Sequence, residues 1–274
     1  GAPHARAALS SLPGDGSLLV DSTQGPWVVR PDGSKRLLGD WDEASWSPHG
    51  LFAVVTRGHE LAAVEPDGTV RWALARPAAP RLARWNGPDG YRIAYLEGHR
   101  LRVVDGDGSE DRPLAGDAAP IAPAWRPGPG HVLTYATRSG AVVALGADSG
   151  KRLFATATGT RVISLQWSGR YLLVARAGRL QLLGRDGRTI RTWTPMPGSR
   201  VRAATLAPRG GSLAIVVGDR RQSRVLLLSR DHGARVLFAC PGAFAAPRWS
   251  PEGRWLLVPW PSADQWLFLR PQGR

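Results

Sequence analysis

The chain has 274 residues, 43% of them hydrophobic and 21% charged, and its 36 Lys and Arg against 22 Asp and Glu give a formal net charge of +14. This composition excludes a disordered, highly charged chain, while 33 Gly and 23 Pro predict many turns and few helices. No apolar run approaches the roughly 20 residues that span a bilayer, and the single Cys excludes an intrachain disulfide.

A short motif recurs along the whole chain. Its clearest copy is Ser-Trp-Ser-Pro-His-Gly at residues 45–50, followed by an apolar run at 51–55, and close echoes lie at 84–96 and 248–258. The anchor positions of all copies are Leu12, Trp46, Trp85, Trp125, Trp167, Leu206 and Trp249. The unit therefore repeats about every 40 residues, a period typical of propellers and solenoids.

A second series of turns runs in phase with the first. Asp-Gly or a related Gly-containing turn occurs at residues 31–33, 66–68, 106–108, 148–150, 185–187, 231–233 and 272–273. Asp-Gly between apolar runs predicts a hairpin, because glycine supplies the positive φ that such turns need. Each unit then contains strands A to D, with the Trp-Ser-Pro turn between A and B and the Asp-Gly turn between C and D. Four antiparallel strands in about 40 residues make one propeller blade.

We therefore predict an all-β fold, a seven-bladed β-propeller of four-stranded antiparallel blades, with a six-bladed ring as the alternative. One domain is expected over residues 1–274. The expected blades are about residues 7–40, 42–75, 81–116, 121–157, 162–194, 201–239 and 245–271.

The first and last blades need special treatment. In the first, strand A is expected to end at Leu12, with strands B, C and D at residues 17–20, 27–29 and 35–38. The last blade stops before a D strand. The offset between repeats places residues 1–5 in that gap, so the amino-terminal segment is predicted to close the ring.

Two histidines occupy matched places on neighbouring blades. His59 and His99 both lie in a B-to-C turn, which raises a ligand or metal site as one interpretation. Exposed turn residues are the favoured interpretation, because no third ligand stands at a spacing that would close a site. The Gly-x-Ser-x-Gly and His-Glu-x-x-His motifs are absent. We therefore expect no catalytic residue, no metal and no cofactor, with a metal-assisted propeller enzyme of lyase or lactonase type as the alternative.

Charge is divided unevenly along the chain. Residues 1–137 hold 14 basic and 16 acidic side chains, whereas residues 138–274 hold 22 basic and 6 acidic ones. In a ring of sequential blades this division becomes spatial. The D-to-A and B-to-C loops share one face of a propeller, here called the loop face, and these loops vary most between blades. The arginines expected there are Arg138, Arg161, Arg176, Arg179, Arg200, Arg220, Arg221 and Arg224, opposite Asp21, Asp40, Asp42, Glu43, Glu60 and Glu97.

We hypothesise that this basic sector docks on an acidic protein or on an anionic membrane or cell-wall polymer. Nucleic acid is less favoured, because the sector has no nucleic-acid motif and few aromatics between its arginines. The competing interpretation is a surface that is only solubilising.

The Trp-Ser-Pro-x-Gly turn, the strand after it and the x-Asp-Gly turn together resemble the TolB-like, WD-type propeller repeats, best at residues 45–68 and 248–258. The resemblance implies a non-catalytic scaffold, protein-binding or sensor module, often extracytoplasmic in bacteria. Residues 142–154 also resemble a repeat of the pyrroloquinoline-quinone dehydrogenase propellers, but the tryptophan-docked motif of those eight-bladed enzymes is missing. The chain starts at Gly1 without Met, so we expect an upstream segment, with a membrane anchor as one option.

Overall fold

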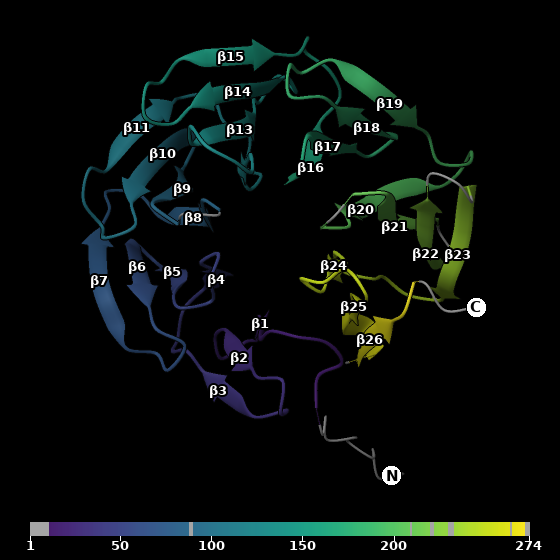
Figure 1. Ribbon diagram of the computed structural model, residues 1–274, viewed down its shortest axis with the longest axis horizontal. Helices are drawn as coiled ribbons and strands as arrows, with labels where there is room; N and C mark the ends of the chain where they lie inside the picture. Colours follow the sequence, from purple (N-terminus) through teal and green to yellow (C-terminus); the bar gives the residue numbers. More distant parts are fainter. Residues whose placement is uncertain are drawn as a thin grey trace.

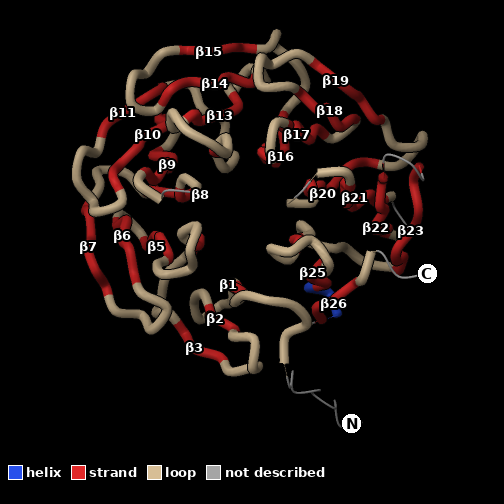
Figure 2. Tube along the Cα trace, in the orientation of Figure 1, coloured by secondary structure: helices blue, strands red, loops and turns tan. Residues whose placement is uncertain are grey.

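A computed structural model describes residues 11–87, 90–208, 210–219, 222–229, 233–263 and 265–271. Seven antiparallel sheets stand around a central channel in these residues (Figure 1). Strands form the blades and turns join them (Figure 2). The prediction of a seven-bladed all-β propeller is confirmed, and the six-bladed alternative is wrong. In the described part of the chain no helix is long and apolar enough to cross a membrane.

Five blades have four strands, ordered A to D from the channel outward. Blade two contains β4 (Glu43–Trp46), β5 (Ala53–Arg57), β6 (Glu60–Val64) and β7 (Val70–Ala75). Blade three contains β8 (Pro80–Trp85), β9 (Arg92–Glu97), β10 (Arg100–Asp105) and β11 (Arg112–Ala115). Blade four contains β12 (Ala124–Trp125), β13 (Val132–Ala136), β14 (Val142–Gly146) and β15 (Arg152–Ala155). Blade five contains β16 (Val162–Ser168), β17 (Tyr171–Arg176), β18 (Arg179–Leu183) and β19 (Thr189–Trp193). Blade six contains β20 (Arg200–Leu206), β21 (Ser212–Gly218), β22 (Ser223–Ser229) and β23 (Gly233–Cys240).

The first and last blades have three strands each in the described residues. Blade one contains β1 (Leu18–Val20), β2 (Trp27–Val29) and β3 (Lys35–Leu37). Blade seven contains β24 (Arg248–Trp249), β25 (Leu256–Trp260) and β26 (Gln265–Leu269), with the 3-10 helix η1 (Pro261–Ala263) before its last strand. Of the A strand predicted for blade one, residues 11 and 12 are described and form no strand, although Leu12 is buried and its N–H donates to the Pro31 carbonyl at 2.8 Å. The predicted closing residues 1–5 lie outside the described residues.

The first described residues lie against the last blade. A Cβ placed on Gly14 would come within 2.9 Å of the Glu252 carboxylate and 3.1 Å of the Trp255 ring. Arg254 and Asp15 approach each other at 4.0 Å. The segment before β1 therefore contacts the A-to-B turn of blade seven, which joins the two ends of the ring.

The anchor residues of the repeat lie at or beside the ends of the inner strands, where they link neighbouring blades. The indole Nε1 of Trp125 donates to the carbonyl of Arg84 at 2.9 Å, and that of Trp249 donates to the carbonyl of Thr205 at 3.3 Å. In both cases the acceptor directly precedes the anchor of the previous blade. Trp125 and Trp249 therefore fill space between blades and hydrogen-bond across it, whereas the buried Nε1 atoms of Trp46 and Trp85 have no hydrogen-bond partner within the described residues.

Apolar side chains fill the spaces between blades. Among the described residues six buried clusters each join two consecutive blades. Strand β17 shows how: Leu172 faces the cluster shared with blade four, while Leu173 faces the one shared with blade six. Both faces of a blade are therefore core, and the exposed ends of the strands remain for function.

The Asp-Gly turns have the chemistry that the sequence predicts. In the turn between β10 and β11, the Asp107 carboxylate accepts the Ser109 N–H at 2.9 Å and the Ser109 hydroxyl at 2.6 Å. Gly108 has φ +88° and lies against the ring of Trp72 from the preceding blade. Glycine is required there both for the backbone conformation and for the close approach of the ring.

Replacing Ser109 by Ala tests this turn. The Ser109 hydroxyl and N–H hold the pKa of Asp107 below its usual value of 3.8. Ser109→Ala removes the first of these bonds, so carboxyl-carbon NMR should show the Asp107 pKa rising toward 3.8 while that of Asp67, in the turn of blade two, stays unchanged. Because the folded-state pKa is depressed, the bond stabilises the fold above the unfolded-state pKa, and this stabilisation is lost as pH falls through the folded-state pKa. An unchanged Asp107 titration would contradict the assignment.

Candidate functional site

The predicted arginines lie at the loop ends of blades four to six. Arg138 lies in the β13–β14 turn, Arg161 directly before β16, Arg179 at the start of β18 and Arg200 at the start of β20. All four are exposed, and none forms an ion pair within the described residues. Their charges are therefore uncompensated by nearby carboxylates in that part of the chain. Arg220 and Arg221 lie outside the described residues.

Arg176 differs from the other arginines and corrects the sequence-based prediction. Its side chain is buried, with the residue only 3% exposed. The guanidinium donates to the carbonyl of Gly140 at 2.9 Å, to Oε1 of Gln181 at 3.1 Å and to the carbonyl of Thr160. Burial, and secondly the charge of Arg179, hold the pKa of Arg176 below its usual value. Arg176 is thus a structural residue and not part of the exposed surface.

The contacts of Arg176 bring the exposed arginines together. Gly140 belongs to the turn that carries Arg138, Thr160 directly precedes Arg161, and Arg179 lies across the hairpin turn from Arg176 itself. A hollow of about 310 Å³, lined in part by Arg179 and Arg176, opens at this border of blades four and five. Three arginines that form no ion pair within the described residues therefore lie on the turn, the connection and the hairpin that meet at Arg176.

A second hollow lies at the loop end of blade six. Its volume is about 550 Å³ and it is lined by Arg200, Arg202, Gly218, Asp219 and their neighbours. Sequence reasoning missed Arg202, which lies at a register shift of β20 against β21, where the regular alternation of a strand is interrupted and gives no signal. Arg224 pairs with Asp219 at 3.3 Å, so its charge is partly neutralised.

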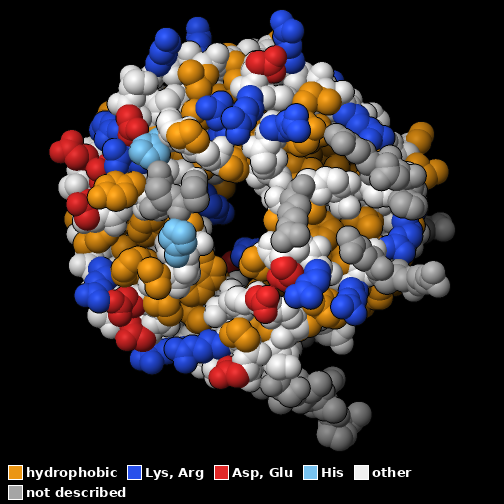
Figure 3. All heavy atoms as spheres, in the orientation of Figure 1, with side chains coloured by type: hydrophobic (Ala, Val, Ile, Leu, Met, Phe, Trp, Pro, Cys, Tyr) orange, Lys and Arg blue, Asp and Glu red, His pale blue; other side chains and the backbone are white. Residues whose placement is uncertain are grey.

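The acidic residues predicted opposite the arginines, in blades two and three, form ion pairs or hydrogen bonds with neighbouring groups. Asp40 and Glu60 both pair with Arg57, and the Asp42 carboxylate accepts a backbone N–H of the β5–β6 turn at 3.0 Å. Glu43 accepts the N–H of Leu82 at 2.6 Å. Figure 3 shows the opposite face, that of the A-to-B and C-to-D turns, where acidic and basic side chains both occur around the ring. Asp40, Asp42, Glu43 and Glu60 are therefore engaged by neighbouring groups of their own half of the ring.

A buried ionic cluster within blade three accounts for Glu97. Arg76 approaches Glu97 at 3.4 Å and Asp111 at 2.6 Å, and Arg102 approaches the same carboxylates at 3.7 and 2.8 Å. The Tyr95 hydroxyl donates to Asp111 at 2.7 Å. Burial, then the bond to Asp111, raises the Tyr95 pKa. Two arginines balance two carboxylates here, so the cluster is neutral and stabilises the connection between blades two and three.

The two matched histidines share one role in this structure. Nδ1 of His59 donates to the carbonyl of Arg76 at 3.2 Å, and Nδ1 of His99 donates to the carbonyl of Ala118 at 3.2 Å. Each thus ties a B-to-C turn to the connection leading into the next blade. The described residues contain no group of three His, Cys, Asp or Glu that could hold a metal ion. The described structure therefore does not bring either histidine into a cluster of possible ligands.

The central channel holds a further arginine. Arg84, on the inner strand β8, lines a cavity of about 810 Å³ between blades three, four and five and donates to the carbonyl of Ala83 at 2.7 Å. Burial lowers its pKa, while the carboxylate of Glu43 acts in the opposite direction. The channel is visible as an opening through the ring (Figure 3).

Arg176 and Arg179 should respond differently to substitution. Arg176→Met leaves the carbonyls of Gly140 and Thr160 without their buried donor, and we expect a loss of about 2 kcal/mol or more in the free energy of unfolding. Arg179→Met should stay within about 0.5 kcal/mol of the parent, because that side chain is exposed. Urea unfolding of both variants measures the difference. Equal stabilities would show that Arg176 does not hold the turn and the connection together.

The ionic cluster of blade three should be sensitive to the loss of one member. Asp111→Asn removes a charge that faces both Arg76 and Arg102, so we expect a loss of about 3–5 kcal/mol in the free energy of unfolding. The control Arg188→Met breaks a pair with Asp186 in which both side chains are mostly exposed, and it should cost less than about 0.5 kcal/mol. A comparable loss for both variants in urea denaturation would contradict this account.

Comparison with known proteins identifies the fold but no family. No protein-family model matches the sequence, and no curated protein matches it. Among solved structures, the β-propeller domain of Cps50 (Swd1) from Myceliophteria thermophila aligns with a TM-score of 0.77 and 12% identity over 97% of each chain. A chain of a mitotic checkpoint complex aligns with a TM-score of 0.75 and 17% identity, over 93% of this chain and 86% of that one. Hydrazine synthase of Kuenenia stuttgartiensis aligns with a TM-score of 0.65 and 16% identity, over 83% and 75%. The chain therefore has the fold of a WD40-type β-propeller.

Proposed function

We propose that this protein is a non-catalytic binding scaffold that docks an acidic segment of a partner protein on the loop ends of blades four to six. The observation that carries the proposal is the arrangement around Arg176. Arg138, Arg161 and Arg179 are exposed, lie on segments that meet at one buried arginine and form no ion pair within the described residues.

The chemistry of arginine supports a protein partner with carboxylates. A guanidinium is planar and presents its N–H groups in a fork that matches a carboxylate, and it is less strongly hydrated than an ammonium. The backbone that carries them is already ordered, so the main entropic cost of binding is that of fixing the side chains, about 0.5–1.5 kcal/mol each. Arg200 and Arg202 beside the hollow of blade six extend the same surface. Their summed positive potential would also accelerate encounter with an acidic partner.

Two similarities support this class of role. The resemblance of the turns to TolB-like repeats implies protein binding or sensing, often outside the cytoplasm. One structural neighbour was solved as part of a mitotic checkpoint complex, and assembly with other proteins is the use of the fold that we propose here. The low sequence identities leave the particular partner to experiment.

Charge reversal tests the proposed surface. Arg138, Arg161 and Arg179 are changed together to Glu and compared with Lys151, Arg185 and Arg188 changed to Glu, an equal charge change in turns at the opposite ends of blades four and five. The probe is a fluorescent 12-residue peptide of alternating Glu and Gly, followed by anisotropy at physiological ionic strength. We expect the loop-face variant to lose about tenfold in affinity, or 1.4 kcal/mol, and the control about threefold or less. Equal losses would mean that net charge alone governs binding.

A duplex DNA of 12 base pairs serves as the competing probe. A scaffold for acidic proteins should bind this DNA without preference for the loop face, so both charge-reversed variants should lose affinity for it to a similar extent. A loss confined to the loop-face variant, with tighter binding than to the peptide, would favour a nucleic-acid partner and contradict the proposal.

A further inference from the structure

Three blades share a bulge at the same place in their outermost strand. In blades two, four and five the register of strand D against strand C shifts by one residue between the first and second pairs after the C-to-D turn. The residues that follow the bulge occupy equivalent positions, and they are Trp72 in blade two, Phe154 in blade four and Arg191 in blade five.

In two of these blades the position holds an aromatic ring that closes the crevice to the next blade. The Trp72 ring lies where a Cβ on Gly108 would be, and its Nε1 donates to the carbonyl of Gly106 at 2.9 Å. The Phe154 ring lies in the same way against Gly187 of blade five. Each ring thus covers the C-to-D turn of its neighbour.

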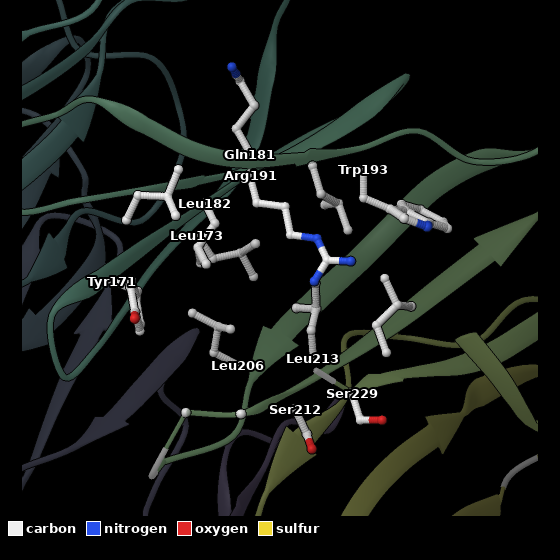
Figure 4. A pocket seen from close by; sticks show the side chains of 15 residues that line it. Tyr171, Leu173, Gln181, Leu182, Arg191, Trp193, Leu206, Ser212, Leu213 and Ser229 are labelled. Atoms are coloured by element: carbon white, nitrogen blue, oxygen red, sulfur yellow. The ribbon is translucent and has the colours of Figure 1, made fainter. Parts of the chain in front are cut away.

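Blade five has Arg191 at this position, and the crevice toward blade six is hollow. The hollow has a volume of about 210 Å³, and its walls include Leu173, Leu182, Leu206 and Leu213, with Tyr171 and Trp193 at its sides. Figure 4 shows the Arg191 side chain reaching between these leucines, with Ser212 and Ser229 at the rim. Arg191 forms no hydrogen bond or ion pair within the described residues. An apolar recess and a cation that has no ion-pair partner within the described residues therefore lie side by side.

We propose that this hollow binds a short linear segment of an acidic partner protein, in which one aromatic side chain is flanked by carboxylates. The aromatic side chain occupies the place that Trp72 and Phe154 occupy in the other crevices. A flanking carboxylate pairs with Arg191, whose methylene stem covers the leucines while its guanidinium turns toward the rim. The hollow lies near the A-to-B and C-to-D turns of blades five and six, away from the loop-face arginines. This inference therefore does not rest on the proposed function.

The size and polarity of the hollow suit this occupant. Pockets for small-molecule ligands are usually about 300–1,000 Å³, and this one is smaller, as a recess for a single side chain should be. Anchor side chains of this kind contribute most of the affinity at protein interfaces when they are aromatic and fully desolvated. Ile190, the extra residue of the bulge, is 56% exposed beside Arg191 and extends the apolar surface.

The probe for this site is the acetylated and amidated pentapeptide Gly-Glu-Phe-Glu-Gly. Its binding is followed by methyl NMR of Leu182 and Leu213, with Leu133 of blade four as an internal reference. We expect saturable shifts of the two pocket leucines only. Replacing the peptide's Phe by Ala should weaken binding about tenfold, because a buried aromatic side chain is lost. Replacing both Glu by Gln should weaken it about two- to fivefold, as for a partly exposed ion pair.

Two substitutions at one position separate the roles of shape and charge. Arg191→Trp supplies the missing ring and should remove binding without lowering the melting temperature. Arg191→Met keeps the recess but removes the cation, so the Glu and Gln peptides should then bind equally. Arg188→Trp adds the same ring to an exposed turn before β19 and should leave binding unchanged. The triple Glu variant of the loop face should also bind this peptide normally, which distinguishes the two sites.

Several outcomes would overturn the proposal. Absence of shifts at Leu182 and Leu213 at millimolar peptide would show that the recess does not accept the segment. Unchanged affinity of Arg191→Trp would place the binding elsewhere. A peptide-independent dimer, seen by sedimentation and lost in Arg191→Trp, would assign the recess to a second copy of this chain. If Arg191→Trp fails to fold, Arg191→Met decides, since a persisting preference for the Glu peptide would exclude Arg191 as its partner.

Discussion

Packing of each blade against the next is the constraint on which this structure depends. Successive residues of a strand point to opposite faces, and in β17 both Leu172 and Leu173 are buried, one against blade four and the other against blade six. A sheet with two apolar faces is stable only when both are covered, and a ring of blades meets this need with every member. Both faces of each blade are therefore needed for packing, and residues can vary mainly in the turns and loops at the strand ends.

An arginine that is buried between blades must find its hydrogen-bond partners there, and the kind of partner decides whether its charge is neutralised. Arg102 and Arg176 are both largely removed from water, but Arg102 faces the carboxylates of Glu97 and Asp111, whereas Arg176 is held by carbonyls and an amide oxygen. The first arrangement is neutral as a whole. The second satisfies the donors of the guanidinium but leaves its charge in place. Arg176 therefore adds to the positive potential of the loop face, although a partner would not reach it.

The repeat itself could be predicted from the sequence, because its turns and anchors are local. Trp85 and Trp125 mark the ends of inner strands, and Asp107 caps its turn as Asp-Gly chemistry requires. The roles of long polar side chains could not be predicted in this way. Arg176 and Arg179 are three residues apart in one hairpin, yet only the first is buried, because its burial depends on a turn of another blade. His59 and His99 do occupy equivalent positions in the repeat, as the sequence indicates. What they share is a hydrogen bond to a backbone carbonyl.

A repeat protein offers its own internal standard for what a position should contain. Trp72 and Phe154 show that the residue after the bulge normally closes a crevice, and that two different rings fulfil this role. Arg191 in the equivalent place cannot close the crevice in the same way, so a recess remains beside it, although Leu173 and Leu206 in its wall are buried. This departure is informative because blades two and four have the same fold with an aromatic ring at this position, so the fold itself does not require an arginine there. Of the arginines of blade five, Arg191 is the one that departs from the repeat, because Arg57 in blade two and Arg100 in blade three stand where blade five has Arg176 and Arg179. The two surfaces that we propose therefore lie at opposite ends of blade five, and a change at either end would leave the packing between them in place.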